Sequence, residues 1–347
     1  MPRPGHAYET ILWTSARTAP LIESVLSKMN GAAKPIGLGG SREPAVRDLA
    51  KRLECEHDDD LRRLLINRPA TYLLLATLDR VPPAALTAAL NQGTTILTLE
   101  PLAATFEELA PPPREEDETE NPRAKIPGVL HHIPAFTRSA GWLSAADPQL
   151  VLGSIKNLAM IAASSAADAS LFARLHESWR IILELAALPE SIDCALQVPP
   201  REQPENLREL TGSLTAHARL PDGGSALIEL SQSAAPSSPI ACDRLLHLVG
   251  ERGRLRATDL TYQLFDHTGL LLDELNPARP APPFTFADAV AHHWMQIIDR
   301  PALAAQSPRD PAAHEAAALA CCLTCLLSAR TGQPESPGKL MFAHGWK

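Results

Sequence analysis

The first hundred residues alternate between short apolar runs and longer segments with helical start and stop signals. The apolar, β-prone runs share a length of four or five residues and lie at residues 10–13, 35–38, 72–76 and 95–99. The helical segments between them begin near proline or acidic residues and lie at residues 20–29, 43–53, 58–66 and 82–91. Buried strands joined by helical crossovers predict a doubly wound parallel sheet with helices on both faces.

The second half of the chain has a different pattern. Residues 149–163 are apolar and predict a strand followed by a helix, and residues 170–188 predict a long helix. Polar and apolar residues then alternate in short runs at 214–220, 226–230, 244–249, 253–257, 261–265 and 270–275. The turn Pro221-Asp222-Gly223-Gly224 predicts a hairpin, and residues 284–298 and 312–327 predict closing helices. We therefore expect an α+β domain with a large, mainly antiparallel sheet.

A chain of 347 residues is too long for one typical core, so we expect two domains. Residues 1–126 would form an N-terminal Rossmann-like domain, and residues 127–347 the C-terminal α+β domain. The segment 108–124 is rich in acidic residues and proline. It is predicted to be a solvated linker or insertion between them.

Composition narrows the classes of function. Hydrophobic residues make up 45% and charged residues 21%, as in ordinary globular proteins. The net charge of −8 and the absence of a long basic stripe argue against a nucleic-acid partner. No apolar run approaches the roughly 18 residues of a membrane span, and the N-terminus lacks the apolar core of a signal peptide. We expect a cytoplasmic protein without a membrane partner.

Three of the six cysteines cluster in one apolar segment, as Cys321, Cys322 and Cys325. The Cys-x-x-Cys spacing could serve a metal or redox site, and a metal or redox protein is one hypothesis. A second pair of ligands at suitable spacing is missing. We therefore predict buried thiols in a core helix and no metal site.

The turn after the first strand is where such sheets place a glycine-rich loop for a pyrophosphate. The glycine positions of G-x-G-x-x-G hold Thr14, Ala16 and Ala19. Alanine leaves some room for phosphates, but Thr14 lacks the permissive backbone of glycine.

After the second strand, Ser41-Arg42 stands where an acidic residue would bind the ribose of NAD. An arginine at this place suits a 2′-phosphate. In the alternative interpretation, Ser41 caps the helix of residues 43–53 and Arg42 is a solvated side chain.

The spacing between residues 75 and 103 resembles that of the Gfo/Idh/MocA oxidoreductases, the glucose–fructose oxidoreductase and inositol dehydrogenase group. Their I-A-T-P turn is similar to Leu75-Ala76-Thr77-Leu78. Their A-L-x-x-G-K-x-V-L-x-E-K-P-L-A segment is similar, without a gap, to residues 89–103, which end in Leu99-Glu100-Pro101-Leu102-Ala103. The turn at 15–19 resembles a T-A-R-I-A variant of their nucleotide loop, and Ser41-Arg42 the S-R of their NADP-preferring members.

The resemblance implies the two-domain fold predicted above, NADP as cofactor and a sugar-like small molecule as substrate. It also implies a homo-oligomer, or a hetero-oligomer with an active paralogue. The residues it assigns to the cofactor are Ser15, Ala16, Arg17, Ser41, Arg42, Ala76 and Thr77.

The chain departs from the family at its catalytic positions. Glu100 replaces the E-K-P lysine, which orients substrate and aids proton transfer, and a carboxylate cannot supply that positive charge. The histidine after the T-P turn falls on Pro82. On the helix of residues 170–188, His176 lies within one residue of the family's histidine, but Phe172 and Trp179 replace its neighbouring carboxylates.

These departures favour a divergent homologue with weakened or lost dehydrogenase activity that acts as a binding or partner subunit. The alternative is an active NADP-dependent oxidoreductase on a sugar or polyol, with Glu100 and His176 as an unconventional acid/base pair. A histidine on a core-facing helix can also be purely structural.

Overall fold

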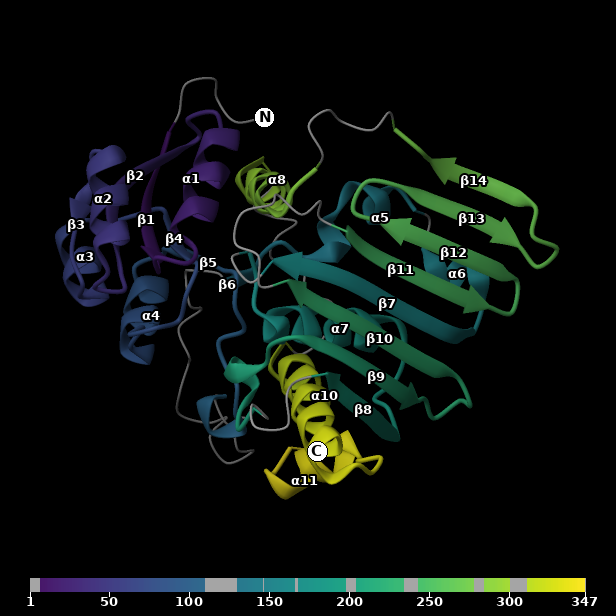
Figure 1. Ribbon diagram of the computed structural model, residues 1–347. Coiled ribbons are helices and arrows are strands. Elements are labelled where there is room, and N and C mark those ends of the chain that lie inside the picture. Colours follow the sequence, from purple (N-terminus) through teal and green to yellow (C-terminus); the bar gives the residue numbers. More distant parts are fainter. Residues whose placement is uncertain are drawn as a thin grey trace, which may run out of the picture. The chain divides into compact units, whose positions relative to one another are not determined.

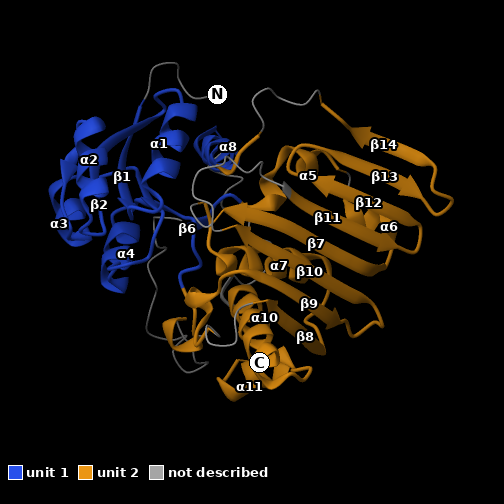
Figure 2. Ribbon diagram, in the orientation of Figure 1, with its two compact units in different colours: residues 1–102, 113–134, 287–307 blue, residues 103–112, 135–286, 308–347 orange. Residues whose placement is uncertain are grey.

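The computed structural model describes most of the chain, namely residues 7–109, 130–145, 147–165, 168–197, 204–233, 243–277, 284–299 and 311–346. The chain divides into two compact units, shown in Figure 2. Unit 1 comprises residues 1–102, 113–134 and 287–307, and unit 2 comprises residues 103–112, 135–286 and 308–347. Most of the acidic linker predicted at 108–124 lies outside the described residues.

Unit 1 is built on a parallel sheet (Figure 1). Its described strands are, in spatial order, β3 (Glu56–His57), β2 (Ala33–Gly40), β1 (Tyr8–Thr14), β4 (Tyr72–Leu75), β5 (Thr95–Thr98) and β6 (Leu130–His132). Each neighbouring pair of these strands runs parallel. The predicted Rossmann-like, doubly wound sheet is therefore confirmed.

The helices of unit 1 begin close to the residues that the sequence indicates. They are α1 (Ala19–Lys28), α2 (Pro44–Arg52), α3 (Leu61–Asn67), α4 (Pro83–Asn91) and α8 (Phe286–Asp299). Proline lies in the first turn of α1, α2 and α4, where its missing N–H has no helical partner to lose. Helix α8 joins unit 1 through Asp288, whose Oδ1 lies 2.6 Å from Lys28 Nζ, and through Trp294, which packs edge-on against Tyr72.

Unit 2 is built on a larger sheet, called here the large sheet. Its described strands are, in spatial order, β14 (Leu271–Leu275), β13 (Tyr262–Asp266), β12 (Gly253–Thr258), β11 (Asp243–Gly250), β7 (Ile155–Ser165), β10 (Ser225–Ser233), β9 (Ser213–Arg219) and β8 (Ser191–Gln197). Strands β7 and β10 pair in parallel, and the other pairings among these strands are antiparallel. The predicted mainly antiparallel sheet is confirmed.

One face of the large sheet carries the core of unit 2. Met160, Leu246 and Leu255 point to this side and are buried, and helices α7 (Leu171–Leu185) and α10 (Pro311–Thr331) pack against it (Figure 1). Alternate residues such as Ile161 and Arg254 point to the opposite side, called here the outer face. The remaining short helices among the described residues are α5 (Ala140–Ser144), α6 (Pro148–Leu152), α11 (Pro337–Ala343) and the 3-10 turns Phe106–Glu108, Phe136–Arg138 and Leu207–Glu209.

The prediction of a strand followed by a helix in residues 149–163 is wrong, because the helix α6 comes first and the strand β7 follows. The Asp147 side chain caps α6 by accepting hydrogen bonds from the N–H groups of Gln149 and Leu150. Gly153, with φ of 73°, ends it. The following residues alternate between buried and exposed, as a half-covered strand does. None of the described helices is long and apolar enough to cross a membrane.

Candidate functional site at the ends of the parallel strands

The residues assigned to the cofactor, together with Glu100, all lie just past the carboxyl ends of adjacent strands of unit 1. They follow β1 (Ser15, Ala16, Arg17), β2 (Ser41, Arg42), β4 (Ala76, Thr77) and β5 (Glu100). Because β2, β1, β4 and β5 are parallel neighbours, these residues share one edge of the sheet. This edge is where open parallel sheets place their ligands.

The loop between β1 and α1 is closed by its own hydroxyl groups. The Ser15 N–H donates to Thr18 Oγ1 at 3.1 Å, and the Thr18 N–H donates back to Ser15 Oγ at 3.4 Å. Thr18 Oγ1 also lies 2.9 Å from Thr14 Oγ1, and both threonines are buried. Threonine side chains thus fill the inside of a turn in which glycines would leave room for a phosphate.

Glu43 joins this loop to the one that follows β2. Its Oε2 accepts the backbone N–H of Ala16 at 3.0 Å and the hydroxyl of Ser41 at 2.7 Å. The Ser41 hydroxyl and then the Ala16 N–H lower the pKa of Glu43, so its carboxylate is charged at neutral pH. An exposed carboxylate therefore accepts the N–H that a nucleotide-binding turn presents to a phosphate.

Ser41 does not cap the following helix, so that prediction is wrong. Helix α2 begins at Pro44, its N-cap residue is Glu43, and no side chain caps it. The Ser41 hydroxyl is directed to Glu43 instead, and the Ser41 N–H donates to the carbonyl of Thr14 at 3.1 Å. Gly40 makes this close approach possible, because its φ is +136° and a Cβ there would lie 1.7 Å from the Thr14 oxygen.

Arg42, predicted to meet a 2′-phosphate, is paired within the protein. Its Nε lies 2.6 Å from Oδ2 of Asp59, and this contact lowers the pKa of Asp59. The arginine side chain is 67% exposed, so the pair is a weak surface pair that a stronger anion could displace. Arg17 is also exposed.

The turn after β4 is held by backbone contacts. The Ala76 N–H donates to the carbonyl of Trp13 at 2.8 Å, and the Trp13 indole N–H donates to the carbonyl of Asp79 at 2.9 Å. Thr77 is buried, and its Oγ1 accepts the Asp79 N–H at 3.2 Å. These hydrogen bonds fix the conformation of the turn, which borders the candidate site at this edge of the sheet.

Glu100 follows β5 in a similarly fixed turn. Its N–H donates to Thr98 Oγ1 at 3.2 Å, and the Thr98 hydroxyl donates to the Glu100 carbonyl at 2.6 Å. Thr98 is buried and the Glu100 side chain is half-buried. The turn thus holds a carboxylate, which can carry a proton but cannot supply the fixed positive charge of a lysine.

His176, the second predicted catalytic residue, lies on α7 in unit 2. It is 2% exposed, and its Nε2 lies 2.9 Å from Oε1 of Glu315 on α10. Phe172 and Trp179, one turn away on either side, are buried. The histidine is thus held between two helices by a carboxylate and apolar packing, an arrangement that suits either a structural or an acid/base role.

The cysteine cluster is part of the core, as predicted. Cys321, Cys322 and Cys325 lie on α10 and have no exposed surface, and burial raises the pKa of each thiol. Across the described part of the chain, no group of three or more histidine, cysteine, aspartate or glutamate side chains is placed to hold a metal ion.

Sequence reasoning missed Glu43, Thr18 and Glu315. Glu43 directly follows Ser41-Arg42, so a search for charges beside the cofactor motif could have found it. Its contact with Ala16 spans 27 residues and has no local pattern. Glu315 carries no signal at all, because its contact with His176 depends on the packing of α7 against α10.

Comparison with known proteins identifies the architecture. No protein-family model and no curated protein matches the chain. Solved structures match it over nearly its whole length. An oxidoreductase from Agrobacterium radiobacter in complex with NAD+, L-tartaric acid and magnesium is 12% identical, with a TM-score of 0.65 over 96% of this chain and 99% of that one. The chain has the fold of the Gfo/Idh/MocA-type oxidoreductases.

Two further structures have this Gfo/Idh/MocA fold in common with the chain. Levoglucosan dehydrogenase, in complex with NADH and levoglucosan, is 13% identical, with a TM-score of 0.63 over 95% of this chain and 99% of that one. Biliverdin reductase from Synechocystis, in complex with biliverdin and NADP+, is 14% identical, with a TM-score of 0.59 over 93% and 98%. The fold implied by the sequence resemblance is thereby confirmed. At identities this low, the chemistry of the protein has to be argued from its own residues.

In the nucleotide loop of this Gfo/Idh/MocA-fold protein, several backbone N–H groups are hydrogen-bonded within the protein. The N–H groups of Ser15, Ala16 and Thr18 already have acceptors inside the protein. One acceptor is the Glu43 carboxylate, which would repel a phosphate at hydrogen-bonding distance from the same N–H.

Proposed function

We propose that this protein is a divergent homologue of NAD(P)-dependent oxidoreductases with weakened or lost dehydrogenase activity, acting as a binding or partner subunit. One observation carries the proposal: the Ala16 N–H at the nucleotide turn donates to the Glu43 carboxylate. A protein that binds a dinucleotide needs that N–H and needs no charge of the same sign as phosphate beside it.

Two further features support the proposal. The hydroxyl groups of Thr14 and Thr18 fill the turn that phosphates would enter. Glu100 stands at the place of the lysine that the resemblance leads us to expect. Together with Glu43, these features disfavour three requirements of hydride transfer. Glu43 disfavours phosphate binding, the two threonines disfavour room for the cofactor, and Glu100 disfavours a positive charge beside the substrate.

A partner subunit would retain the two-unit fold because the fold presents a surface for another subunit and a place for a ligand. We expect a homo-oligomer, or a hetero-oligomer with an active paralogue, in the cytoplasm. A sugar-like small molecule remains the expected ligand, since such molecules are recognised by side chains that need no cofactor.

An active NADP-dependent oxidoreductase on a sugar or polyol is the second candidate. The contact of 2.9 Å between His176 Nε2 and Glu315 Oε1 favours it, because a carboxylate that orients an imidazole is a common element of acid/base sites. The exposed Arg42 also favours it, since a 2′-phosphate could displace Asp59.

Turnover assays separate the two candidates. We expect the purified protein to reduce neither NADP+ nor NAD+ with a panel of sugars and polyols, followed by the absorbance of the reduced cofactor. The variant Glu43→Ala/Glu100→Lys tests whether the two changed carboxylates suppress activity. If the wild type turns over a substrate and the variant His176→Gln does not, the protein is an active oxidoreductase. Purification of the tagged protein from its own cells, with mass spectrometry of bound chains, tests the partner role.

A further inference from the structure

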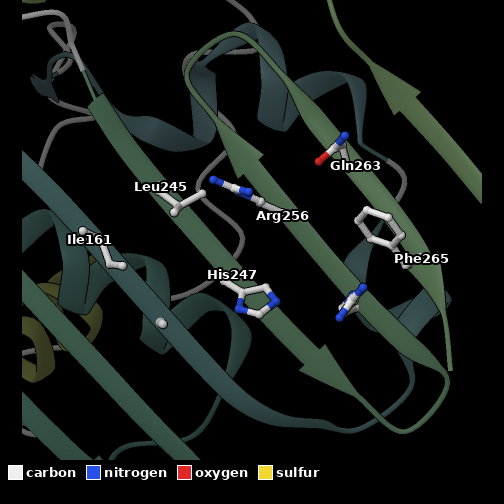
Figure 3. Close-up of a pocket in the computed structure, with 8 residues that line it drawn as sticks. Ile161, Leu245, His247, Arg256, Gln263 and Phe265 are labelled. Carbon is white, nitrogen blue, oxygen red and sulfur yellow. The ribbon is translucent and has the colours of Figure 1, made fainter. Parts of the chain in front are cut away.

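A buried network of charged side chains lies between helix α7 and the large sheet, within unit 2. It is called here the Glu177 network, and its members are Arg174, Glu177, Arg244 and Asp259. Arg244 belongs to β11, where its neighbours Leu245 and His247 line a hollow on the outer face, shown in Figure 3. The Arg244 side chain points the other way, to Glu177 of α7, and is buried.

Glu177 joins three segments of the chain. Its Oε1 lies 2.5 Å from Arg244 Nη1 and accepts the backbone N–H of Phe136 at 2.7 Å. Its Oε2 accepts a hydrogen bond of 3.1 Å from Nη1 of Arg174, which lies on α7 itself. Both carboxylate oxygens are thus used. Hydrogen bonds to a charged group are stronger than neutral ones, and burial protects them from screening by salt.

The network lies where the chain passes between the two units. Three crossing points fall within the described residues, at 102–103, 134–135 and 286–287. Phe136, whose N–H is bound by Glu177, directly follows the second of them. Phe286, the last residue of unit 2 before the third, lies against Arg174, with 4.5 Å between the guanidinium carbon and the ring centroid. Phe136, Phe286 and Arg174 are all buried.

A continuous series of contacts therefore connects two crossing points that are far apart in sequence. It runs from the Phe286 ring to Arg174, from Arg174 to Glu177 and from Glu177 to the N–H of Phe136. The ring fixes the position of the guanidinium group, and a desolvated cation–π contact of this kind is stronger than an exposed one. An arginine without the ring would lose more side-chain entropy in holding Glu177.

We propose that the Glu177 network couples the two crossing points, so that loosening of the chain at Phe286 is transmitted through Arg174 and Glu177 to Phe136. Coupling of this type is carried by packed and hydrogen-bonded side chains in contact with one another. The proposal goes beyond the proposed function, because it concerns contacts within unit 2 and does not depend on whether a dinucleotide binds.

Hydrogen exchange of the whole chain, resolved to single residues by mass spectrometry with electron-transfer fragmentation, tests the coupling. Phe286→Leu should speed exchange of the Phe136 N–H at least about threefold, the size expected for loss of a buried cation–π contact. Arg174→Lys should have the same effect, because it keeps a cation beside Glu177 but lacks the flat guanidinium group. It gives a second measurement should Phe286→Leu fail to fold.

A double-mutant cycle shows whether the effect passes through Glu177. Glu177→Gln alone should speed exchange of the Phe136 N–H, because a neutral amide oxygen is the weaker acceptor. In that background, Phe286→Leu should have no further effect at Phe136.

Two controls accompany the cycle. Phe342→Leu removes a ring that is 78% exposed on α11 and should change nothing at Phe136. Residues 103–109, which follow the remaining described crossing point, should exchange alike in all variants, since Phe106 there stacks on His344.

Three results would overturn the proposal. One is equal exchange of the Phe136 N–H in the wild type, Phe286→Leu and Arg174→Lys. The second is an equal effect of Phe286→Leu with and without Glu177→Gln, which would show that the carboxylate does not transmit it. The third is a rise of the same size in β9 and β10, which would reveal a general loss of stability in unit 2.

Discussion

The backbone N–H of Ala16 donates a hydrogen bond of 3.0 Å to Oε2 of Glu43, and the same oxygen accepts the hydroxyl of Ser41. This contact ties together the two loops that a dinucleotide would need on a parallel sheet of this kind. The carboxylate carries a charge of the same sign as the phosphates of a dinucleotide. The proposed loss of nucleotide binding depends on it.

The pKa of Glu43 should be lower than the usual value of about 4.3 for glutamate. A lowered pKa in the folded state means that the contact stabilises the fold above the usual pKa. This stabilisation is lost as the pH falls through the lowered value. An NMR titration that follows the side-chain carboxyl carbon of Glu43 against pH measures this pKa. Ser41→Ala should raise the pKa of Glu43 and leave that of Asp59, set by Arg42, where it is. An ordinary pKa for Glu43 in the wild type would contradict the contact.

Gly40→Ala should destabilise unit 1 strongly. The new Cβ would lie 1.7 Å from the Thr14 oxygen, at a φ of +136°, so β1 and β2 would have to separate. We expect a loss of about 3 kcal/mol or more in the free energy of unfolding, measured with urea. Gly31→Ala is the matched control, because φ is +78° there with no atom within 4 Å, and it should cost about 1 kcal/mol. Equal losses would show that the strand ends are not packed as described.

Arg244→Met should destabilise unit 2. Arg244 is 1% exposed, with its Nη1 2.5 Å from Oε1 of Glu177 and its Nε 3.1 Å from both carboxylate oxygens of Asp259. The variant removes the arginine from both carboxylates, of which Glu177 keeps Arg174, with Nη1 3.1 Å from its Oε2. Breaking such a buried pair from one side costs about 3 to 5 kcal/mol. The exposed pair of Arg219 and Glu190 offers the control, and Arg219→Met should cost at most about 1 kcal/mol. Urea denaturation distinguishes the two, and a small effect of Arg244→Met would contradict the burial of this pair.

Most of the fold could be predicted from the sequence, because buried strands and amphipathic helices have distinct periods. The runs at 72–76 and 95–99 gave β4 and β5 almost residue for residue. The failure at residues 149–163 has a local cause. Periodicity alone does not separate a short helix from a strand, and Asp147, whose side chain caps α6, lies just before the apolar run.

The candidate site could be located but not described from the sequence. The order of strands and turns placed Ser15, Ser41 and Glu100 past the strand ends. Two side chains there decide the chemistry. Thr18 contacts Ser15 within one loop, whereas the contact of Glu43 with Ala16 is set by the packing of two loops. No motif encodes the contact of Glu43, because it depends on how β1 and β2 lie side by side.

Calorimetric titration with NADPH and NADH tests the central claim most directly. We predict no saturable binding to the wild type up to about 1 mM, and at least a tenfold gain in affinity for Glu43→Ala, which removes the competing charge. Glu23→Ala, which removes a charge on α1 that pairs with Arg52, should show no gain. Micromolar binding of either dinucleotide by the wild-type protein would contradict the account.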